Sequence, residues 1–177
     1  MFKCPECGNE VRENDNMCYN CGASLDNFLS IIKEANDGDA DAQGALGSMY
    51  GRGIYVDLDY DKSFYWWKKA AENGVANAQG KIGALYALGC GVAQNYELAY
   101  YWTRKAVENG SELAMAELAK YYLNGEGTEK NVIRALYWLI QARNHGVAEA
   151  SNMLDAMGIA DAQFFNEDTM LSFRKKN

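Results

Sequence analysis

The stretch that decides the fold is residues 39–74, DADAQGALGSMYGRGIYVDLDYDKSFYWWKKAAENG. Its pattern returns in residues 75–110 and 111–146, so equivalent positions lie 36 residues apart. A period of this length indicates a stack of supersecondary units, each of which contacts its neighbours. The positions in register are Trp66, Trp102 and Trp138; Tyr50, Tyr86 and Tyr122; Gly74, Gly110 and Gly146; Ala42, Ala78, Ala114 and Ala150; and Leu46, Ile82, Leu118 and Leu154.

Each unit is predicted to hold two helices joined by a loop. Ala42, Leu46 and Tyr50 have the spacing of one apolar helix face. Asp59 stands at the N-cap position of a second helix, which Gly74 ends. The first helices of the first two units contain the glycines Gly44, Gly47, Gly80 and Gly83. Because glycine weakens a helix, these residues predict the close approach of a neighbouring helix, while the recurring tryptophans predict core packing.

The pattern resembles the SEL-one-like repeat, a branch of the tetratricopeptide-like superfamily. The residues that carry the resemblance are Ala40, Ala42, Leu46-Gly47, Tyr50, Gly53, Asp59, Lys62, Trp66 and Lys69-Ala70-Ala71-Glu72-Asn73-Gly74. Tyr55 departs from it, because the later units have the second glycine of a Gly-x-Gly loop there. The resemblance implies an all-α, right-handed superhelical solenoid of helix-turn-helix units.

The chain is predicted to have three parts. Residues 1–24 form a small zinc ribbon, residues 25–160 the solenoid, and residues 161–177 a C-terminal capping segment. The full repeats cover about 39–74, 75–110 and 111–146, with a partial repeat at each end. Since almost no linker separates Cys21 from Phe28, we expect the head to pack on the first helix.

The head contains two C-x-x-C pairs, each followed by a glycine. Two residues between thiolates let both sulfurs face one ion, and two such turns complete a tetrahedral site with no open position. A redox dithiol is the alternative, but it requires a βαβ context that this chain lacks. The sequence therefore predicts one structural zinc ion held by Cys4, Cys7, Cys18 and Cys21. The head also resembles the short zinc ribbons at the N-termini of many bacterial proteins.

The composition of the chain argues against nucleic acid and membranes as partners. The net charge is −7, which opposes a general role in binding nucleic acid, since such binding depends on cations that neutralise phosphates. The apolar runs are shorter than a membrane span requires, and the N-terminus has no secretory signal pattern. We therefore expect a cytoplasmic protein with no membrane partner.

No catalytic group is predicted. His145 is the single histidine and precedes a helix-ending glycine, which is a structural position. Cys90 lies in a loop with no visible base. The segment from Ser30 to Lys33 matches S-x-x-K, but its companion motifs are absent, and Ser30 takes the register of Trp66, so it is expected to face the partner helix.

The function predicted is a non-catalytic scaffold that binds a protein or peptide, with no small-molecule substrate. Alternatives are a regulatory subunit of an enzyme complex and, less favoured, a zinc-ribbon nucleic-acid adaptor. The resemblance implies that the first helix of each unit lines a concave groove, with a shallow floor at Gly44, Gly80 and Ala116. The convex side or the zinc head are the alternative contact surfaces. The predicted groove residues are Asp41, Ser48, Arg52, Asn77, Ala84, Leu88, Lys120, Leu123, Asn124, Glu149 and Asn152.

Overall fold

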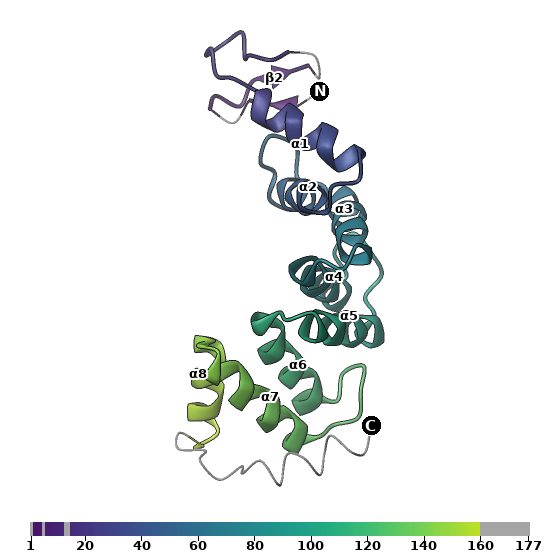
Figure 1. The fold of residues 1–177 in the computed structure, drawn as a ribbon, viewed down its shortest axis with the longest axis vertical. Helices are drawn as coiled ribbons and strands as arrows, with labels where there is room; N and C mark the ends of the chain where they lie inside the picture. Colours follow the sequence, from purple (N-terminus) through teal and green to yellow (C-terminus); the bar gives the residue numbers. More distant parts are fainter. Residues whose placement is uncertain (1, 5, 13–14, 160–177) are drawn as a thin grey trace.

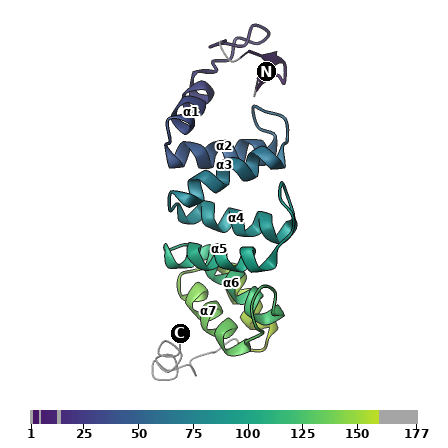
Figure 2. The same cartoon turned by 90° about the vertical axis from the view of Figure 1, so that its right-hand side faces the viewer.

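The computed structural model describes residues 2–4, 6–12 and 15–159. A short hairpin is followed by helices that stack along one axis, with the head at one end and α7 and α8 at the other (Figures 1 and 2). The strands are β1 (Phe2–Lys3) and β2 (Glu10–Val11), which pair antiparallel. The helices are α1 (Asp26–Asn36), α2 (Ala40–Arg52), α3 (Tyr60–Glu72), α4 (Ala76–Leu88), α5 (Tyr96–Glu108), α6 (Glu112–Asn124), α7 (Val132–Asn144) and α8 (Ala148–Ala156). The predicted all-α solenoid behind a small head is confirmed.

The helix ends follow the predicted local chemistry. The side chains of Asp59, Asn95 and Asn131 cap α3, α5 and α7 by accepting a backbone N–H three residues on. Gly74 and its equivalents follow these helices in the left-handed conformation, with φ of 86° at Gly74. Polar N-caps and left-handed glycines therefore set the same boundaries in every unit.

The tryptophans in register are not the deepest core residues. Trp66, Trp102 and Trp138 are half-buried, whereas Trp67 and its equivalents, Thr103 and Leu139, are buried. The tryptophans in register therefore pack against the core as expected, but the deepest position is the next residue along the chain. The reason is geometric, because α3 turns Trp67 toward the glycines of α2.

The interior glycines provide the predicted close approach at three of the four positions. A Cβ added to Gly47 would lie 2.8 Å from Cγ of Trp67, and one added to Gly44 would lie 3.2 Å from the same ring. At Gly83 it would lie 2.5 Å from Oγ1 of Thr103. Gly80 differs, since a Cβ there would meet only the Ala106 methyl at 3.9 Å.

A pair of buried glutamines ties successive helices together. Gln43 Nε2 donates to the Ala35 carbonyl at 3.3 Å, and its Oε1 accepts from Asn73 at 3.1 Å. Gln79 and Asn109 repeat this arrangement one unit on, with the Ala71 carbonyl as acceptor. Each glutamine thus satisfies a carbonyl near the end of the preceding helix and links it to the end of the following one.

The loop of each later unit packs on the helix of the unit before it. Gly91, with φ of 69°, is so close to the start of α3 that a Cβ would lie 2.0 Å from the Tyr60 carbonyl oxygen. Gly127 lies in the same way against the Tyr96 carbonyl. Tyr55 occupies the equivalent position in the first unit and keeps the left-handed backbone, with φ of 64°. A side chain fits there because the head, rather than a full repeat, precedes this loop.

Gly91→Ala is expected to lower the free energy of unfolding by about 3 kcal/mol. Left-handed backbone costs a non-glycine residue about 1–2 kcal/mol, and the clash with Tyr60 adds to this. Gly110→Ala is the matched control, because Gly110 also has a positive φ, of 89°, but nothing lies within 4 Å of an added Cβ. Urea denaturation followed by circular dichroism measures both variants. Equal losses in the two would show that the close approach is not tight.

Candidate metal centre and groove

The two cysteine turns of the head have the same backbone geometry. In the first, the Cys4 N–H donates to the Asn9 carbonyl and the Gly8 N–H donates to the Cys4 carbonyl, both at 2.8 Å. The second turn repeats both bonds at Cys18 and Gly22, also at 2.8 Å. Gly8 and Gly22 have φ of 73° and 76°, which explains the glycine behind each pair.

The four cysteine sulfurs of the head converge on one point. All lie within 4.8 Å of one another, with 3.4 Å between Sγ of Cys4 and Cys21 and 3.6 Å between Sγ of Cys7 and Cys18. None of these cysteines is in a disulfide. A metal–sulfur distance near 2.3 Å gives a tetrahedron with edges of about 3.8 Å, so the arrangement fits a four-thiolate ion.

The two exposed thiols of the head, Cys7 and Cys21, differ in pKa. The Asn9 N–H and then the Asn20 side chain lower the pKa of Cys7 to about 6. The Ala23 N–H lowers the pKa of Cys21, but contact with Cys4, burial and the other cysteines outweigh it and raise that pKa to about 12. At neutral pH this difference favours a thiolate at Cys7 and a thiol at Cys21. A bound divalent ion would favour the thiolate at every ligand.

The head is joined to the repeats by aromatic contacts. The Phe2 ring meets the Phe28 ring edge-on, with centroids 4.8 Å apart, and Phe28 stacks on Tyr55 at 4.9 Å. The Lys3 N–H donates to the Tyr55 carbonyl at 2.6 Å, and the Lys3 ammonium pairs with Asp57. Phe28 is buried on α1, so the head packs on the first helix as expected.

A hollow of about 500 Å³ opens between α4 and α6, and we call it the α4–α6 hollow. Its lining comes from α4, α6, Thr103, Ser111 and Glu149. Leu88 and Leu113 are 72% and 71% exposed, although both are large and apolar. The lining residues are Asn77, Gly80, Lys81, Ala84, Ala87, Leu88, Thr103, Ser111, Leu113, Ala114, Glu117, Tyr121 and Glu149.

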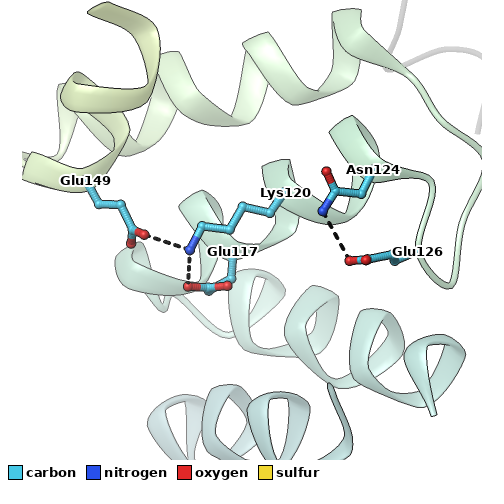
Figure 3. Close-up of polar contacts among 5 residues, drawn as sticks. All are labelled: Glu117, Lys120, Asn124, Glu126 and Glu149. Atoms are coloured by element: carbon cyan, nitrogen blue, oxygen red, sulfur yellow. Dashed lines mark hydrogen bonds and ion pairs between the residues drawn. The ribbon is translucent and has the colours of Figure 1, made fainter. Parts of the chain in front are cut away.

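A bridged ion pair lies beside this hollow. Lys120 Nζ is 2.8 Å from Glu117 and 2.6 Å from Glu149, which links α6 to α8 (Figure 3). Partial burial lowers the pKa of Lys120, but the hydrogen bonds to both carboxylates outweigh it and raise the pKa. Farther along α6, Asn124 donates to Glu126 at 3.2 Å (Figure 3).

Comparison with known families identifies the repeat. The family described as Sel1 repeat matches residues 40–75, 76–111 and 113–147, and a zinc-ribbon domain matches residues 1–25. The chain belongs to the Sel1 repeat family. A search of curated proteins finds no match.

Two solved structures are similar to this Sel1 repeat chain at 30% identity. One is a protective antigen of uropathogenic Escherichia coli strains with an SLR fold, which has a TM-score of 0.70 over 72% of this chain and 27% of the antigen. The chain thus spans less than a third of that antigen. The other is a Sel1 repeat protein from Oxalobacter formigenes, with a TM-score of 0.68 over 75% of this chain and 99% of that one.

A third structure, Helicobacter pylori cysteine rich protein B, is 22% identical and shows the fold alone. Its TM-score is 0.56 over 71% of this chain and 96% of that protein. None of the described helices of the present chain has the length and apolarity required to span a bilayer.

The structure brings some of the predicted groove residues of this Sel1 repeat chain together. Asn77, Ala84, Leu88 and Glu149 line the hollow, and Lys120 contacts its edge through Glu117. The other predicted residues are not part of its lining: Asp41, Ser48, Arg52, Leu123, Asn124 and Asn152. Of the three residues expected to form the groove floor, Gly80 lines the hollow, whereas Gly44 is covered by Trp67 and Ala116 is buried.

Three lining residues were missed although the sequence signals them. Leu113 has the same repeat position as Asp41 and Asn77, so the rule that selects those two also selects it. Lys81 and Glu117 share another position, which varies from Ala45 to Lys81 to Glu117 across the units. The signal in the sequence was that the residue type at these positions, on an exposed helix face, changes from one repeat to the next.

The structure does not bring the residues considered for catalysis together. His145 is the C-cap of α7, and its Nδ1 lies 3.0 Å from Glu112. Cys90 is partly buried in its loop. Ser30 is exposed and bonds to Glu34, so the expectation that it faces the partner helix is wrong. It lies on the outer side of α1, which has no preceding repeat to pack against.

Proposed function

We propose that the chain is a non-catalytic scaffold whose first helices, on the concave face, bind a protein or peptide segment. The observation that carries this proposal is the α4–α6 hollow, where Leu88 and Leu113 expose large apolar side chains beside charged ones. Exposed apolar surface rimmed by polar residues is typical of protein contact sites. Sel1 repeats generally mediate protein–protein interaction, which supports the same function.

The test of the proposed face requires a captured native partner. The variant Arg52→Glu/Lys120→Glu is expected to weaken partner binding at least tenfold in calorimetry. Because Lys120 bridges two carboxylates, the melting temperature of the variant is measured alongside. Tyr19→Asp tests the head without disturbing the repeats, since Tyr19 is 82% exposed. Loss of binding in Tyr19→Asp alone would assign the contact to the head instead.

We further propose that the head holds zinc in a structural role and that the protein is bacterial and cytoplasmic. Free thiols in the head favour a reducing compartment, and the similar structures whose source is given come from bacteria. Zinc would supply only charge neutralisation and a cross-link between the two cysteine turns. Cys4 and Cys18 are buried within the head and Cys7 and Cys21 are exposed, and a site of four thiolates leaves no open coordination position.

Elemental analysis of protein purified without added metal is expected to give one zinc per chain. Cys21→Ser removes a ligand and should abolish stoichiometric binding, because three thiolates leave an open position. Cys90→Ser, outside the cluster, should retain the metal. A zinc ratio near zero in the unmodified protein, or disulfides among the four head cysteines, would contradict the proposal.

A further inference from the structure

Two leucines on different repeats face the same hollow. Leu88 is the last residue of α4 and Leu113 lies in the first turn of α6, and each exposes more than two thirds of its surface. Ala84, Gly80 and Ala114 lie between them, so the surface there is lined by small side chains.

Asn109, which precedes α6, bonds to Gln79 near the start of α4, so Leu113 lies at the end of the hollow away from Leu88. Nine residues of helix separate Gln79 from Leu88, a rise of about 13 Å. Each leucine can therefore contact a separate apolar side chain of one bound segment. A small molecule would need to be surrounded more completely, since such ligands bury most of their surface.

The charges around the hollow are unequally paired. Glu117 and Glu149 both bond to Lys120, so the carboxylates on the α6 side already have a cation. Lys81 on the α4 side is exposed and has no hydrogen bond or ion pair to any residue that the structure describes. An incoming cation would have to compete with Lys120, whereas an incoming carboxylate would meet an ammonium that has no competing partner.

We propose that the α4–α6 hollow binds a peptide segment of a partner protein that places one aliphatic or aromatic side chain on Leu88, a second on Leu113, and an Asp or Glu carboxylate against Lys81. The apolar contacts supply affinity, and the charge pair selects among apolar segments. This inference rests on the proposed function, because it specifies what the scaffold face recognises. The two repeats that form the hollow must both be present for the site to exist.

The test uses selection from a library of random 12-residue peptides displayed on phage, with the metal-loaded full chain as bait. Enriched peptides are expected to share two apolar residues with Asp or Glu between them. A synthetic peptide of the enriched sequence should bind the Leu88→Gln/Leu113→Gln variant at least tenfold more weakly. Leu58→Gln is the control, because Leu58 is 55% exposed and does not line the hollow.

Reversing the charge at residue 81 and in the peptide distinguishes this specific recognition from nonspecific peptide binding. Lys81→Glu should weaken the acidic peptide at least tenfold and should favour the same peptide with its acid replaced by Lys. Lys33→Glu changes the net charge equally on α1 and should leave both affinities unchanged. An absence of enrichment, basic flanks in the enriched peptides, or equal affinity for both peptides in Lys81→Glu would overturn the proposal.

If the hollow binds something other than a partner peptide, the experiments give a different result for each occupant. If the chain forms dimers in light scattering that the leucine variant abolishes, the hollow takes a second copy and the proposal is wrong. If a chain ending at residue 159 binds the peptide at least tenfold more tightly, the chain's own C-terminal residues fill the hollow, which also overturns it. A native partner that still depends on Arg52 and Lys120 would leave the scaffold function intact in either case.

Discussion

Removal of the metal is expected to unfold the head and to loosen α1 and the first loop, while α5 to α7 stay folded. The hairpin has strands of two residues each, and the buried cluster among the described residues of the head consists of Cys4, Val11, Cys18 and Leu25. So small a cluster cannot offset the conformational entropy of the head. Zinc binding in comparable small sites contributes about 10–16 kcal/mol, and this free energy becomes folding free energy.

The effect should reach the first repeat through named contacts. Phe28 loses its contact with Phe2, and Tyr55 loses the N–H of Lys3. Hydrogen exchange with mass spectrometry, with and without a chelator, is expected to show at least tenfold faster exchange in residues 26–36 and 53–58. Cys18→Ser should reproduce this pattern without a chelator, and Cys90→Ser should not. Unchanged exchange in α1 would show that the head and the solenoid are independent.

The second large effect is expected at Trp67. Trp67→Ala should lower the free energy of unfolding by about 3–5 kcal/mol, which is the range for truncating a buried aromatic residue. The cavity cannot be refilled from α2, because the positions facing the ring are Gly44 and Gly47. Trp102→Ala is the paired variant and should cost less, because Trp102 is half-buried.

Denaturation followed by circular dichroism at 222 nm compares the two variants without relying on tryptophan fluorescence. The difference between the two losses of unfolding free energy shows how much more residue 67 contributes to the core than the tryptophan in register at residue 102. If Trp102→Ala costs as much as Trp67→Ala, the half-buried series carries more of the core than its exposure indicates.

Much of the fold was predictable because each unit repeats the same local chemistry. N-caps such as Asp59 and closing glycines such as Gly74 act within a few residues of the chain, so sequence spacing determines them. Whether Trp66 or Trp67 enters the core could not be decided in this way. A period of 36 fixes register but not the rotation of a helix about its axis, which depends on the glycines opposite.

The polar core was harder to predict. Gln43 and Gln79 are 36 residues apart, as are Asn73 and Asn109, so the period marks them. Their burial follows from the carbonyls of α1 and α3, whose position depends on how helices pack. The α4–α6 hollow has the same origin, because it lies between two units. The cysteine turns were predictable in full, since each is built from bonds within five residues.

The loop contact at Gly91 decides how the array could be lengthened by gene duplication. A second copy of residues 75–110 would bring a glycine to the helix start of the copy before it, so the junction would reproduce the existing one. A tandem copy of residues 39–74 would instead bring Tyr55 to a place where even a Cβ lies 2.0 Å from the Tyr60 carbonyl. Residues 39–74 can therefore serve only as the first unit after the head. Duplication can lengthen the array only by copying the units that follow it.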